Sequence, residues 1–424
     1  MTRRLGIIAA AAAGLLGAGP ALACPAKIGA TLSLTGSYAT FGPPISNAAA
    51  LAVEQLNQAG WKVGGCDRLE YIVRDDQTQP SVGVDAARRL VDLDGVPAMV
   101  GPITSGVTGP VLSSVTVEKG VLMIPSASSS PTFSEMARDG KLKGLFYRVQ
   151  PSDALQAVAA AKLAWDAGHR NIAIVNLNND WGNNLAKQFS ATFRAMGGKV
   201  AAQVTYNAEQ PSYRGEVNRA LDAKPDSAFV ISTVIDGSKI LRDWISLGGT
   251  QKFLFPLGMN DAKLIEQIGD QYLKEAWFVT PGAPAPNSRA VFYEAFEKRY
   301  GLEPGKGVGP GRDTGYDAAA LIGLAMVAAQ NIKDGKAIAA GVAKVTDPAG
   351  TPISTTVEDF RKAIQLLSEG KTIRYVGASG AMRHDQYGDV TTPFVGWQVE
   401  NKTYVQKKNV SAEEVAELKQ KTGT

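Results

Sequence analysis

Histidine and cysteine are scarce in this chain of 424 residues, which contains two of each. His169 and His384 have no Cys, His or carboxylate at metal-ligand spacing, so we expect no metal site. No Gly-x-Ser-x-Gly or dinucleotide-type glycine motif follows an expected strand, and the near P-loop at 301–307 has no strand before it. We therefore expect neither an enzyme nor a bound cofactor, although a Ser-His-Asp site built from distant residues stays open.

Strong charge and long apolar runs are also lacking. The net charge is +4, and no basic stripe with interleaved aromatics occurs, so nucleic acid is not expected as a partner. The one prominent apolar run, Leu5–Gly19, follows Arg3 and Arg4 and precedes Ala21-Leu22-Ala23. This pattern predicts a signal peptide over residues 1–23 that is cleaved after Ala23, and hence an exported, periplasmic protein. An uncleaved anchor is the alternative.

The two cysteines, Cys24 and Cys66, each precede an expected strand, at 27–32 and 69–74. If these strands are parallel neighbours, the cysteines lie at the same end of one sheet. In an exported chain such a lone pair predicts a disulfide. Lipidation of Cys24 is the alternative, but Ala21 stands where lipoprotein signals usually have leucine.

Short apolar strands alternate with helical stretches, which predicts βαβ units and parallel sheets. The pattern runs once to about residue 148 and then restarts. A Pro- and Gly-rich crossing follows at 281–286, the helices after 288 have no sheet of their own, and a β-meander is expected at 380–406. We predict an α/β protein with two Rossmann-like lobes and a ligand cleft between them: lobe 1 is assigned to 24–148 plus 281–375, and lobe 2 to 149–280 plus 376–424.

Two loops rich in small and hydroxyl residues, 101–106 and 124–131, follow consecutive strands of the first unit. The carboxyl ends of parallel strands share one edge, where open α/β sheets bind ligands and helix N-termini favour anions. The serines could instead be helix caps and turn formers. Tyr38, Phe41 and Trp181 fall in loops expected at the same edge, so we interpret the loops as part of a ligand site.

Several segments of the sequence resemble those of a known family. The matching pieces are 28–36, Phe41-Gly42, 75–80, 101–105, 124–131 and 178–182. Nearly the whole mature chain resembles the periplasmic solute-binding proteins of branched-chain amino-acid ABC transporters, which have the type I periplasmic-binding fold. The resemblance implies three hinge crossings, closure of the lobes over a ligand, and ABC permease subunits as partners of a monomer.

The resemblance also implies site residues. Ser105 and Ser129 would donate hydroxyls to a ligand carboxylate, with the backbone of Ala127 beside them. Phe41 and Trp181 would form side-chain walls, and Tyr38 lies near them.

One loop departs from the family pattern. Amino-acid binders hold the ligand ammonium with a Glu at the position where this chain has Leu257. Burying an ammonium without a counter-charge is costly, so either Asp236 replaces the Glu or the ligand has no ammonium. Leu257 and Met259, together with the two walls, favour a carboxylate with an apolar or aromatic body. Branched-chain or other amino acids, and then amides or urea-like solutes, are the alternatives, and a sensory protein serving a receptor is the alternative class.

Overall fold

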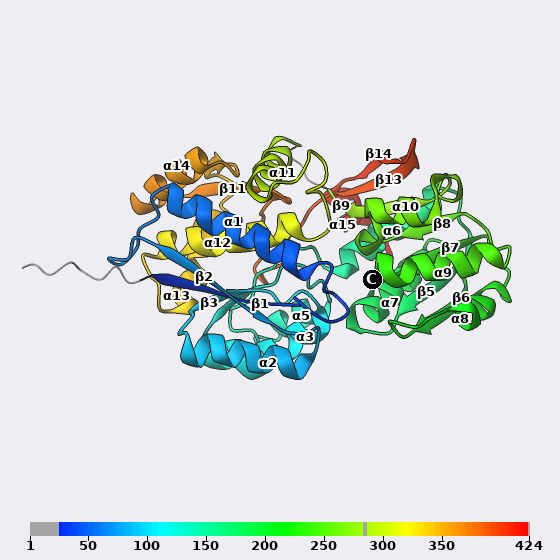
Figure 1. Cartoon of the computed structure of the whole chain (residues 1–424), viewed down its shortest axis with the longest axis horizontal. Helices are drawn as coiled ribbons and strands as arrows, with labels where there is room; N and C mark the ends of the chain where they lie inside the picture. The colour runs from blue at the N-terminus through cyan, green and yellow to red at the C-terminus, as the bar shows by residue number, and fades with distance from the viewer. Residues whose placement is uncertain (1–24, 283–285, 423–424) are drawn as a thin grey trace, which may run out of the picture.

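The computed structural model describes residues 25–282 and 286–422, and its chain forms two lobes side by side (Figure 1). The predicted signal peptide, its cleavage site and Cys24 lie outside the described residues. Cys66 is fully buried in lobe 1, and its pairing with Cys24 stays a prediction. None of the helices in the described part of the chain is both long and apolar enough to cross a bilayer.

Lobe 1 is built on a parallel sheet of four strands in the order β2-β1-β3-β4. The strands are β1 (Ala26–Leu32), β2 (Leu69–Asp75), β3 (Ala98–Val100) and β4 (Leu122–Ile124). β1 pairs with β2 in parallel, with Ala26 opposite Leu69. The expectation that the strands after the two cysteines are parallel neighbours is therefore confirmed.

Helices cover both faces of this sheet, as the continuous burial of its short strands requires. The helices of this lobe are α1 (Gly42–Gln58), α2 (Pro80–Arg88) with η1 (Arg89–Leu93), α3 (Ser105–Val111) with η2 (Leu112–Thr116) and α4 (Val117–Lys119), α5 (Thr132–Arg138), α11 (Pro286–Tyr300), α12 (Arg312–Ala329), α13 (Gly335–Val345) and α14 (Val357–Ser368). Of these, α1, α2, η2, α12 and α13 contact the strands of this sheet, whereas α11 packs on α1, and α14 packs on α1 and α12. α12 is buried from Asp313 to Ala328. A side chain added at Gly323 would meet Leu56 of α1 at 2.5 Å, so close packing of these two helices needs glycine there.

The helices after 288 do have strands of their own, contrary to the sequence-based expectation. β10 (Thr351–Ile353), β11 (Ile373–Gly377) and β12 (Gly380–Ala381) form a separate three-stranded sheet on lobe 1. These strands lack the continuous apolar run that marks the buried strands: β10 reads Thr-Pro-Ile, β12 reads Gly-Ala, and Arg374 interrupts β11.

Lobe 2 contains a seven-stranded sheet in the order β14-β13-β9-β8-β7-β5-β6. Its elements are α6 (Asp153–Asp166), β5 (Asn171–Leu177), α7 (Asp180–Ala195), β6 (Lys199–Tyr206), α8 (Arg214–Leu221), β7 (Ser227–Ile231), α9 (Val234–Ser246), β8 (Phe253–Phe255), η3 (Leu257–Met259), α10 (Ala262–Ile268), η4 (Asp270–Tyr272), β9 (Trp277–Pro281), β13 (Phe394–Glu400), β14 (Thr403–Val410) and α15 (Ala412–Thr422). The predicted meander is in fact the β13–β14 hairpin, and it extends this sheet through antiparallel pairing with β9.

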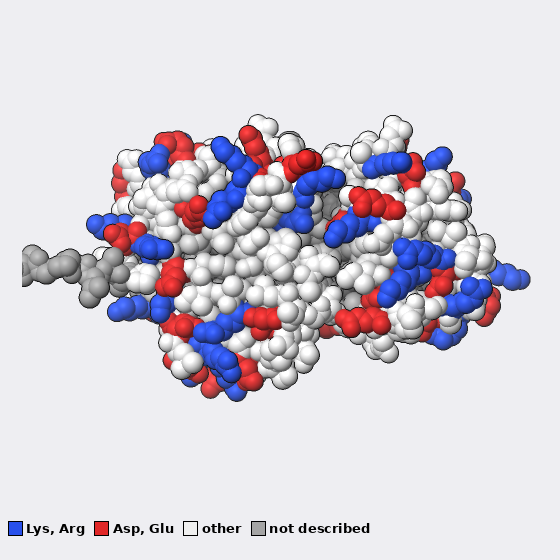
Figure 2. All heavy atoms as spheres, in the orientation of Figure 1, with Lys and Arg blue, Asp and Glu red and all other residues white. Residues whose placement is uncertain are grey.

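The chain passes between the lobes three times: between β4 and α6, between β9 and α11, and between β12 and β13. These passages are the three hinge crossings that the resemblance implied. Basic and acidic side chains are interspersed on the face shown in Figure 2, without a continuous basic stripe there.

Candidate functional site

A small cavity of about 80 Å³ lies between the lobes. Its walls come mainly from the loops after β1, β3 and β4 in lobe 1 and after β5, β7 and β8 in lobe 2. Both sheets therefore present their carboxyl edges to it, as expected for an open α/β protein. We call this cavity the cleft; the predicted site residues in its wall are Tyr38, Phe41, Ser105, Ala127, Ser129, Trp181 and Leu257.

The loop after β3 is shaped by a glycine that no other residue could replace without strain. Gly101 has φ of +84°, and an added Cβ would lie 2.1 Å from the carbonyl oxygen of Thr31. The chain can then begin α3 at Ser105, whose hydroxyl accepts a hydrogen bond from the backbone N–H of Ser130 at 3.2 Å. This bond ties the two hydroxyl-rich loops together at the cleft wall.

The serines after β4 have different tasks. Ser128 is buried behind the wall: its Oγ lies 2.5 Å from the Thr108 hydroxyl and 3.2 Å from the carbonyl oxygen of Pro102. Ala127 and Ser129, on either side of it, line the cleft. The structural interpretation of the serines therefore applies to Ser128, whereas Ala127 and Ser129 lie in the wall of the cleft.

Two carboxylates hold the loop that carries the aromatic wall of lobe 1. Asp76 accepts a hydrogen bond from the Ser33 hydroxyl at 2.7 Å, and Asp75 accepts one from the Leu34 N–H at 2.9 Å. Hydrogen bonds from Thr35, Gln77 and Leu34 lower the pKa of Asp75, although its partial burial opposes them. The Asp75-Asp76 pair of the resembling segment is thus an anchor for the loop after β1.

That loop places two rings in the cleft. Tyr38 and Phe41 have ring centroids 5.6 Å apart. Burial raises the pKa of Tyr38 to about 12, so its hydroxyl is neutral at physiological pH and can donate or accept a hydrogen bond. The two rings are tilted by 44°, so an apolar ligand body would meet an angled aromatic surface with one hydroxyl group.

Lobe 2 contributes the opposite wall. Asn179 caps α7 by accepting a hydrogen bond from Gly182 N at 2.7 Å, and this cap sets Trp181 at the start of the helix. Trp181 packs over the η3 turn: a Cβ at Gly258 would be 3.5 Å from its ring and 2.8 Å from the Ser232 carbonyl oxygen. The close approach leaves Leu257 facing the cleft beside the indole.

Two predicted residues do not reach this wall. Met259 is fully buried in the lobe 2 core, under Gly237. Asp236 is also buried; its carboxylate accepts from the N–H of Glu209 at 3.2 Å and lies 3.9 Å from Lys239 Nζ. Thr233 and Leu257, which precede Asp236 and Met259 by three and two residues, line the cleft in their place.

Several residues of the cleft wall were not predicted from the sequence. Gln150, Gln156, Thr233, Pro310 and Gly311 also line the cleft. The two glutamines belong to the first crossing and the start of α6, where polar residues among buried alanines were an available signal. Pro310 and Gly311 come from a Gly/Pro loop that is far away in the sequence, and only the packing of α12 brings it there.

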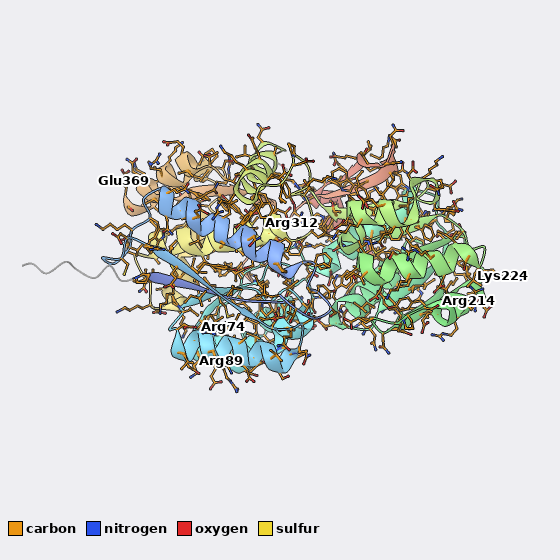
Figure 3. The ribbon with its side chains drawn as sticks, in the orientation of Figure 1. Arg74, Arg89, Arg214, Lys224, Arg312 and Glu369 are labelled. Atoms are coloured by element: carbon orange, nitrogen blue, oxygen red, sulfur yellow. The ribbon has the colours of Figure 1, made fainter. Side chains whose placement is uncertain are left out.

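A second feature of that loop is its fixed position. Arg312, at the end of α12 that faces lobe 2 in Figure 3, donates a hydrogen bond to the carbonyl oxygen of Gly307. Gly307 N in turn donates to Glu297 at 2.8 Å. The two residues of lobe 2 that Figure 3 labels, Arg214 and Lys224, lie at the outer end of that lobe, away from the cleft.

A buried arginine supports the hydroxyl-rich loop from behind. Arg148 is fully buried; its Nε donates to Asp389 at 2.6 Å, its Nη1 to the Ser130 carbonyl oxygen at 2.9 Å and its Nη2 to the Ser134 hydroxyl at 2.6 Å. It therefore links the third crossing, which carries Asp389, to the loop that carries Ala127 and Ser129.

The lobes also touch across the cleft. Asn184 of α7 donates a hydrogen bond to the Ser130 hydroxyl at 3.3 Å. Together with the small cleft volume, this contact indicates that the lobes are close together, so a ligand would enter only after they separate.

One buried carboxyl lies directly behind the cleft wall. The Asp153 N–H donates to the Ser129 carbonyl oxygen at 2.7 Å, and the side chain is fully buried. Burial raises the pKa of Asp153 to about 7, and the Ser129 hydroxyl and the Arg148 charge offset only part of this rise. Among the described residues of the cleft wall itself, none is acidic or basic.

Metal binding has no support in the described residues, which contain no group of three or more His, Cys, Asp or Glu that could hold an ion. His169 and His384 are both buried or partly buried. Burial lowers the pKa of His169 to about 4, and His384 Nε2 lies 2.8 Å from the Arg148 carbonyl oxygen.

Comparison with known proteins gives sequence relatives that include named binding proteins. A family model described as "Periplasmic binding protein" matches residues 25–368. The Leu/Ile/Val-binding protein BraC3 of Rhizobium johnstonii is 36% identical over 171 residues, which make up 40% of this chain and 44% of that relative. The chemotactic signal transduction system substrate-binding protein BasB of Halobacterium salinarum is 27% identical over 363 residues, 84% of this chain and 82% of its own.

Solved structures share the fold. The leucine-binding protein LivK of Thermotoga maritima matches with a TM-score of 0.75 at 22% identity, covering 92% of this chain and 99% of its own. LivJ of Streptococcus pneumoniae, solved with isoleucine, matches with a TM-score of 0.73 at 18% identity and the same coverage. The family match over most of the described residues shows that the chain belongs to the periplasmic binding protein family, and the solved structures share its two-lobed fold.

Proposed function

We propose that this protein is the exported solute-binding component of an ABC importer and that it captures a small carboxylate with an apolar or aromatic body. The ligand carboxylate would be held by Ser105, Ser129 and the backbone of Ala127. The body would lie between Phe41 and Trp181, and Leu257 would face it where an amino-acid binder has its acid.

The observation that carries this proposal is the uneven chemistry of the cleft wall. Hydroxyl groups and a helix start lie on the lobe 1 side, where a carboxylate would receive hydrogen bonds. On the lobe 2 side, Trp181, Leu257 and Gly258 are apolar, and Thr233 adds one hydroxyl. Because an unpaired ammonium buried among such groups costs several kcal/mol, a ligand without one fits better.

Amino-acid binding is the second candidate, and the relatives favour it. BraC3 is named for leucine, isoleucine and valine, and the LivJ structure contains isoleucine. Asp153, behind the wall, could supply a counter-charge if a ligand ammonium lowered its pKa. The third candidate is a sensory role, because BasB is named for chemotactic signal transduction.

Ligand class is tested by a thermal-shift screen of the mature protein against leucine, isoleucine, valine, benzoate, 3-phenylpropanoate, cinnamate and simple amides. Aromatic or aliphatic acids should raise the melting temperature, and amino acids should do so less. Stabilisation by leucine-like amino acids without stabilisation by aromatic acids would replace our proposal with the second candidate.

The importing role needs a separate experiment in the source organism. Deletion of the gene should abolish uptake of the radiolabelled ligand while chemotaxis toward it persists. Unchanged uptake with lost chemotaxis would favour the sensory role.

A further inference from the structure

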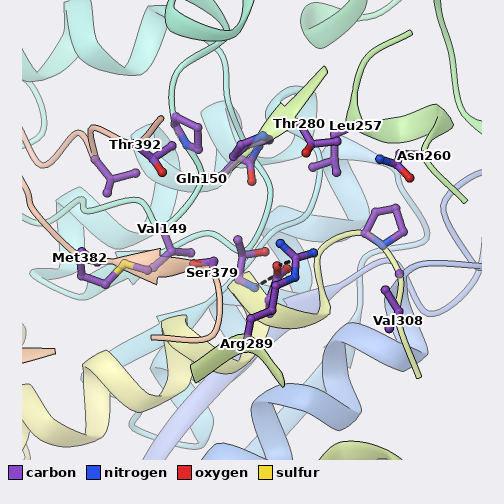
Figure 4. A pocket seen from close by; sticks show the side chains of 18 of the residues that line it. Val149, Gln150, Leu257, Asn260, Thr280, Arg289, Val308, Ser379, Met382 and Thr392 are labelled. Carbon is purple, nitrogen blue, oxygen red and sulfur yellow. Dashed lines mark hydrogen bonds and ion pairs between the residues drawn. The ribbon is translucent and has the colours of Figure 1, made fainter. Parts of the chain in front are cut away.

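A second cavity lies beside the cleft, on the side of the hinge crossings (Figure 4). Its volume is about 270 Å³, against about 80 Å³ for the cleft. We call it the hinge chamber. Its wall includes segments of all three crossings, among them Val149, Pro281 and Thr392.

The hinge chamber and the cleft share part of their walls. Gln150, Leu257 and Pro310 line both cavities. A molecule held in the cleft would therefore reach the hinge chamber past these three side chains. Ligand pockets usually measure about 300–1,000 Å³, so the cleft alone is small for a ligand with a ring and a carboxylate, and the adjoining chamber supplies the missing space.

The hinge chamber differs from the cleft because it contains a charged side chain. Arg289 of α11 extends toward the middle of the lining residues in Figure 4, and its Nη2 lies 3.4 Å from Asp313 Oδ2. A guanidinium has five N–H donors and one carboxylate cannot occupy them all. Donors of Arg289 therefore remain for an acceptor atom inside the chamber.

The other polar groups of this wall offer both donors and acceptors. The Thr392 hydroxyl donates to the Gly282 carbonyl oxygen at 2.8 Å, and the Thr280 hydroxyl accepts from Trp397 Nε1 at 2.9 Å. The amides of Gln150 and Asn260 bring two N–H donors each. Arg289 and Asp313 together are neutral, so the chamber suits a neutral group better than a cation. The N–H donors of the guanidinium favour a neutral group that has an acceptor oxygen.

We propose that the hinge chamber is a second subsite of the same ligand site and that it binds the far end of an elongated ligand through a carbonyl or hydroxyl oxygen hydrogen-bonded to Arg289. This inference rests on the proposed function, because the ligand carboxylate occupies the cleft at Ser105 and Ser129. It adds that the ligand is longer than an amino acid such as leucine and is polar at both ends.

Matched pairs of ligands test this subsite by isothermal titration calorimetry. Each pair shares a phenyl ring and a carboxylate on a linker of zero, one or two carbons, and carries either a para-acetyl or a para-ethyl group. Ethyl reproduces the two carbons of acetyl, and only acetyl has an acceptor oxygen. We expect the wild type to bind the acetyl member of at least one pair about tenfold more tightly, as for a hydrogen bond to a charged donor.

Variants at Arg289 assign that preference to the chamber. Arg289→Met should reduce the preference for acetyl to below about threefold and leave the affinity for the ethyl compound within about twofold of wild type. Arg289→Lys should retain part of the preference. Arg299→Met is the control, since Arg299 is on the same helix and pairs with Glu54 on the surface at 2.7 Å; it should change neither affinity.

The outcomes separate the two proposals. Equal affinities within every pair for the wild type, or an acetyl preference that survives in a folded Arg289→Met protein, would overturn the subsite while the carboxylate function stands. Failure of all these acids to bind, together with binding of leucine, would overturn the proposed function and the subsite with it. Circular dichroism melting of each variant establishes that it is folded.

Discussion

At the residue scale, the two serines of the cleft wall are the clearest candidates for ligand contact. Ser105→Ala and Ser129→Ala each remove one hydroxyl that faces the cleft, and a hydrogen bond to a charged group contributes about 1.5–3 kcal/mol. We expect each change to weaken binding of a carboxylate ligand about tenfold or more in calorimetry. Ser129→Ala should leave the melting temperature almost unchanged, whereas Ser105→Ala also removes the acceptor of the buried Ser130 N–H and should lower it.

Ser113→Ala is a matched control for this prediction, because Ser113 is exposed and its hydroxyl bonds only locally, to the Gly109 carbonyl oxygen at 3.0 Å. It should leave the affinity unchanged. Wild-type affinity in both cleft variants would show that Ser105 and Ser129 merely organise the two loops.

The raised pKa of Asp153 predicts that the stability of the protein depends on pH. Its pKa is about 7 in the folded protein because of burial, against 3.8 for an ordinary aspartate. Below a pH of about 4 the group is protonated in both states and has no effect. As the pH rises from about 4 to about 7, the unfolded chain ionises first, so this carboxyl lowers the free energy of unfolding; above that range the loss is constant.

The measurement is urea unfolding of wild type and Asp153→Asn across this range. The free energy of unfolding of the variant, relative to wild type, should increase with pH up to about 7 and then level off. A difference that does not vary with pH would mean that the carboxyl is ionised in the folded protein. The same group should make carboxylate binding weaker above neutral pH, since a second negative charge then lies behind Ser129.

At the scale of the elements, the loop after β4 depends on a segment that is far away in sequence. Arg148→Met breaks the buried pair with Asp389 and the bond to the Ser130 carbonyl oxygen. Removing one partner of a buried pair costs about 3–5 kcal/mol. We expect the free energy of unfolding, measured by chemical denaturation, to fall by that amount. We also expect the folded variant to bind ligand more weakly than wild type, because the loop that carries Ala127 and Ser129 loses its support.

Lys141→Met is the control for this element, because it removes an exposed pair with Asp139 in the same lobe. It should change neither quantity measurably. If Arg148→Met behaved like this control, the buried pair would not be needed to hold the loop.

The elements also show how far sequence reasoning reaches. The alternation of apolar strands and helices in residues 26–281 identified the strands of both parallel sheets, because each is a short buried run between clear turns. The same reasoning failed for β10, β11 and β12, which contain no uninterrupted apolar run, and for the partner of the final hairpin. β13 joins lobe 2 by pairing with β9, and nothing in the local sequence states which edge a hairpin will extend.

At the scale of the whole molecule, the contact between Asn184 and Ser130 predicts a bias toward closed lobes without ligand. Asn184→Ala removes this 3.3 Å hydrogen bond. We expect the ligand-free variant to have a larger radius of gyration in small-angle X-ray scattering, and ligand to restore the wild-type value. Asn183→Ala is the control, because Asn183 bonds to Asn176 within lobe 2 at 2.9 Å. Identical scattering of both variants without ligand would show that closure does not depend on Asn184.

The site was predicted unevenly for a physical reason. The hydroxyls of Ser105 and Ser129 and the rings of Phe41 and Trp181 follow strands, so the topology of a parallel sheet brings them to one edge. Asp236 lies in the first turn of α9 and Met259 in η3, and packing such as that of Met259 under Gly237 decides that their side chains are buried away from the cleft.

By itself the sequence determined the class of fold, the two-lobed plan and the hydroxyl-rich loops of the cleft wall, because these follow from local periodicity and from residues next to strand ends. Only the tertiary structure decided what closes the site. It brings Arg289 and Pro310 from helices and loops of lobe 1 to the hinge, next to Gln150 of the first crossing and Leu257 of lobe 2. Contacts between segments more than a hundred residues apart are set by the packing of the lobes and the three crossings, and no local pattern encodes them.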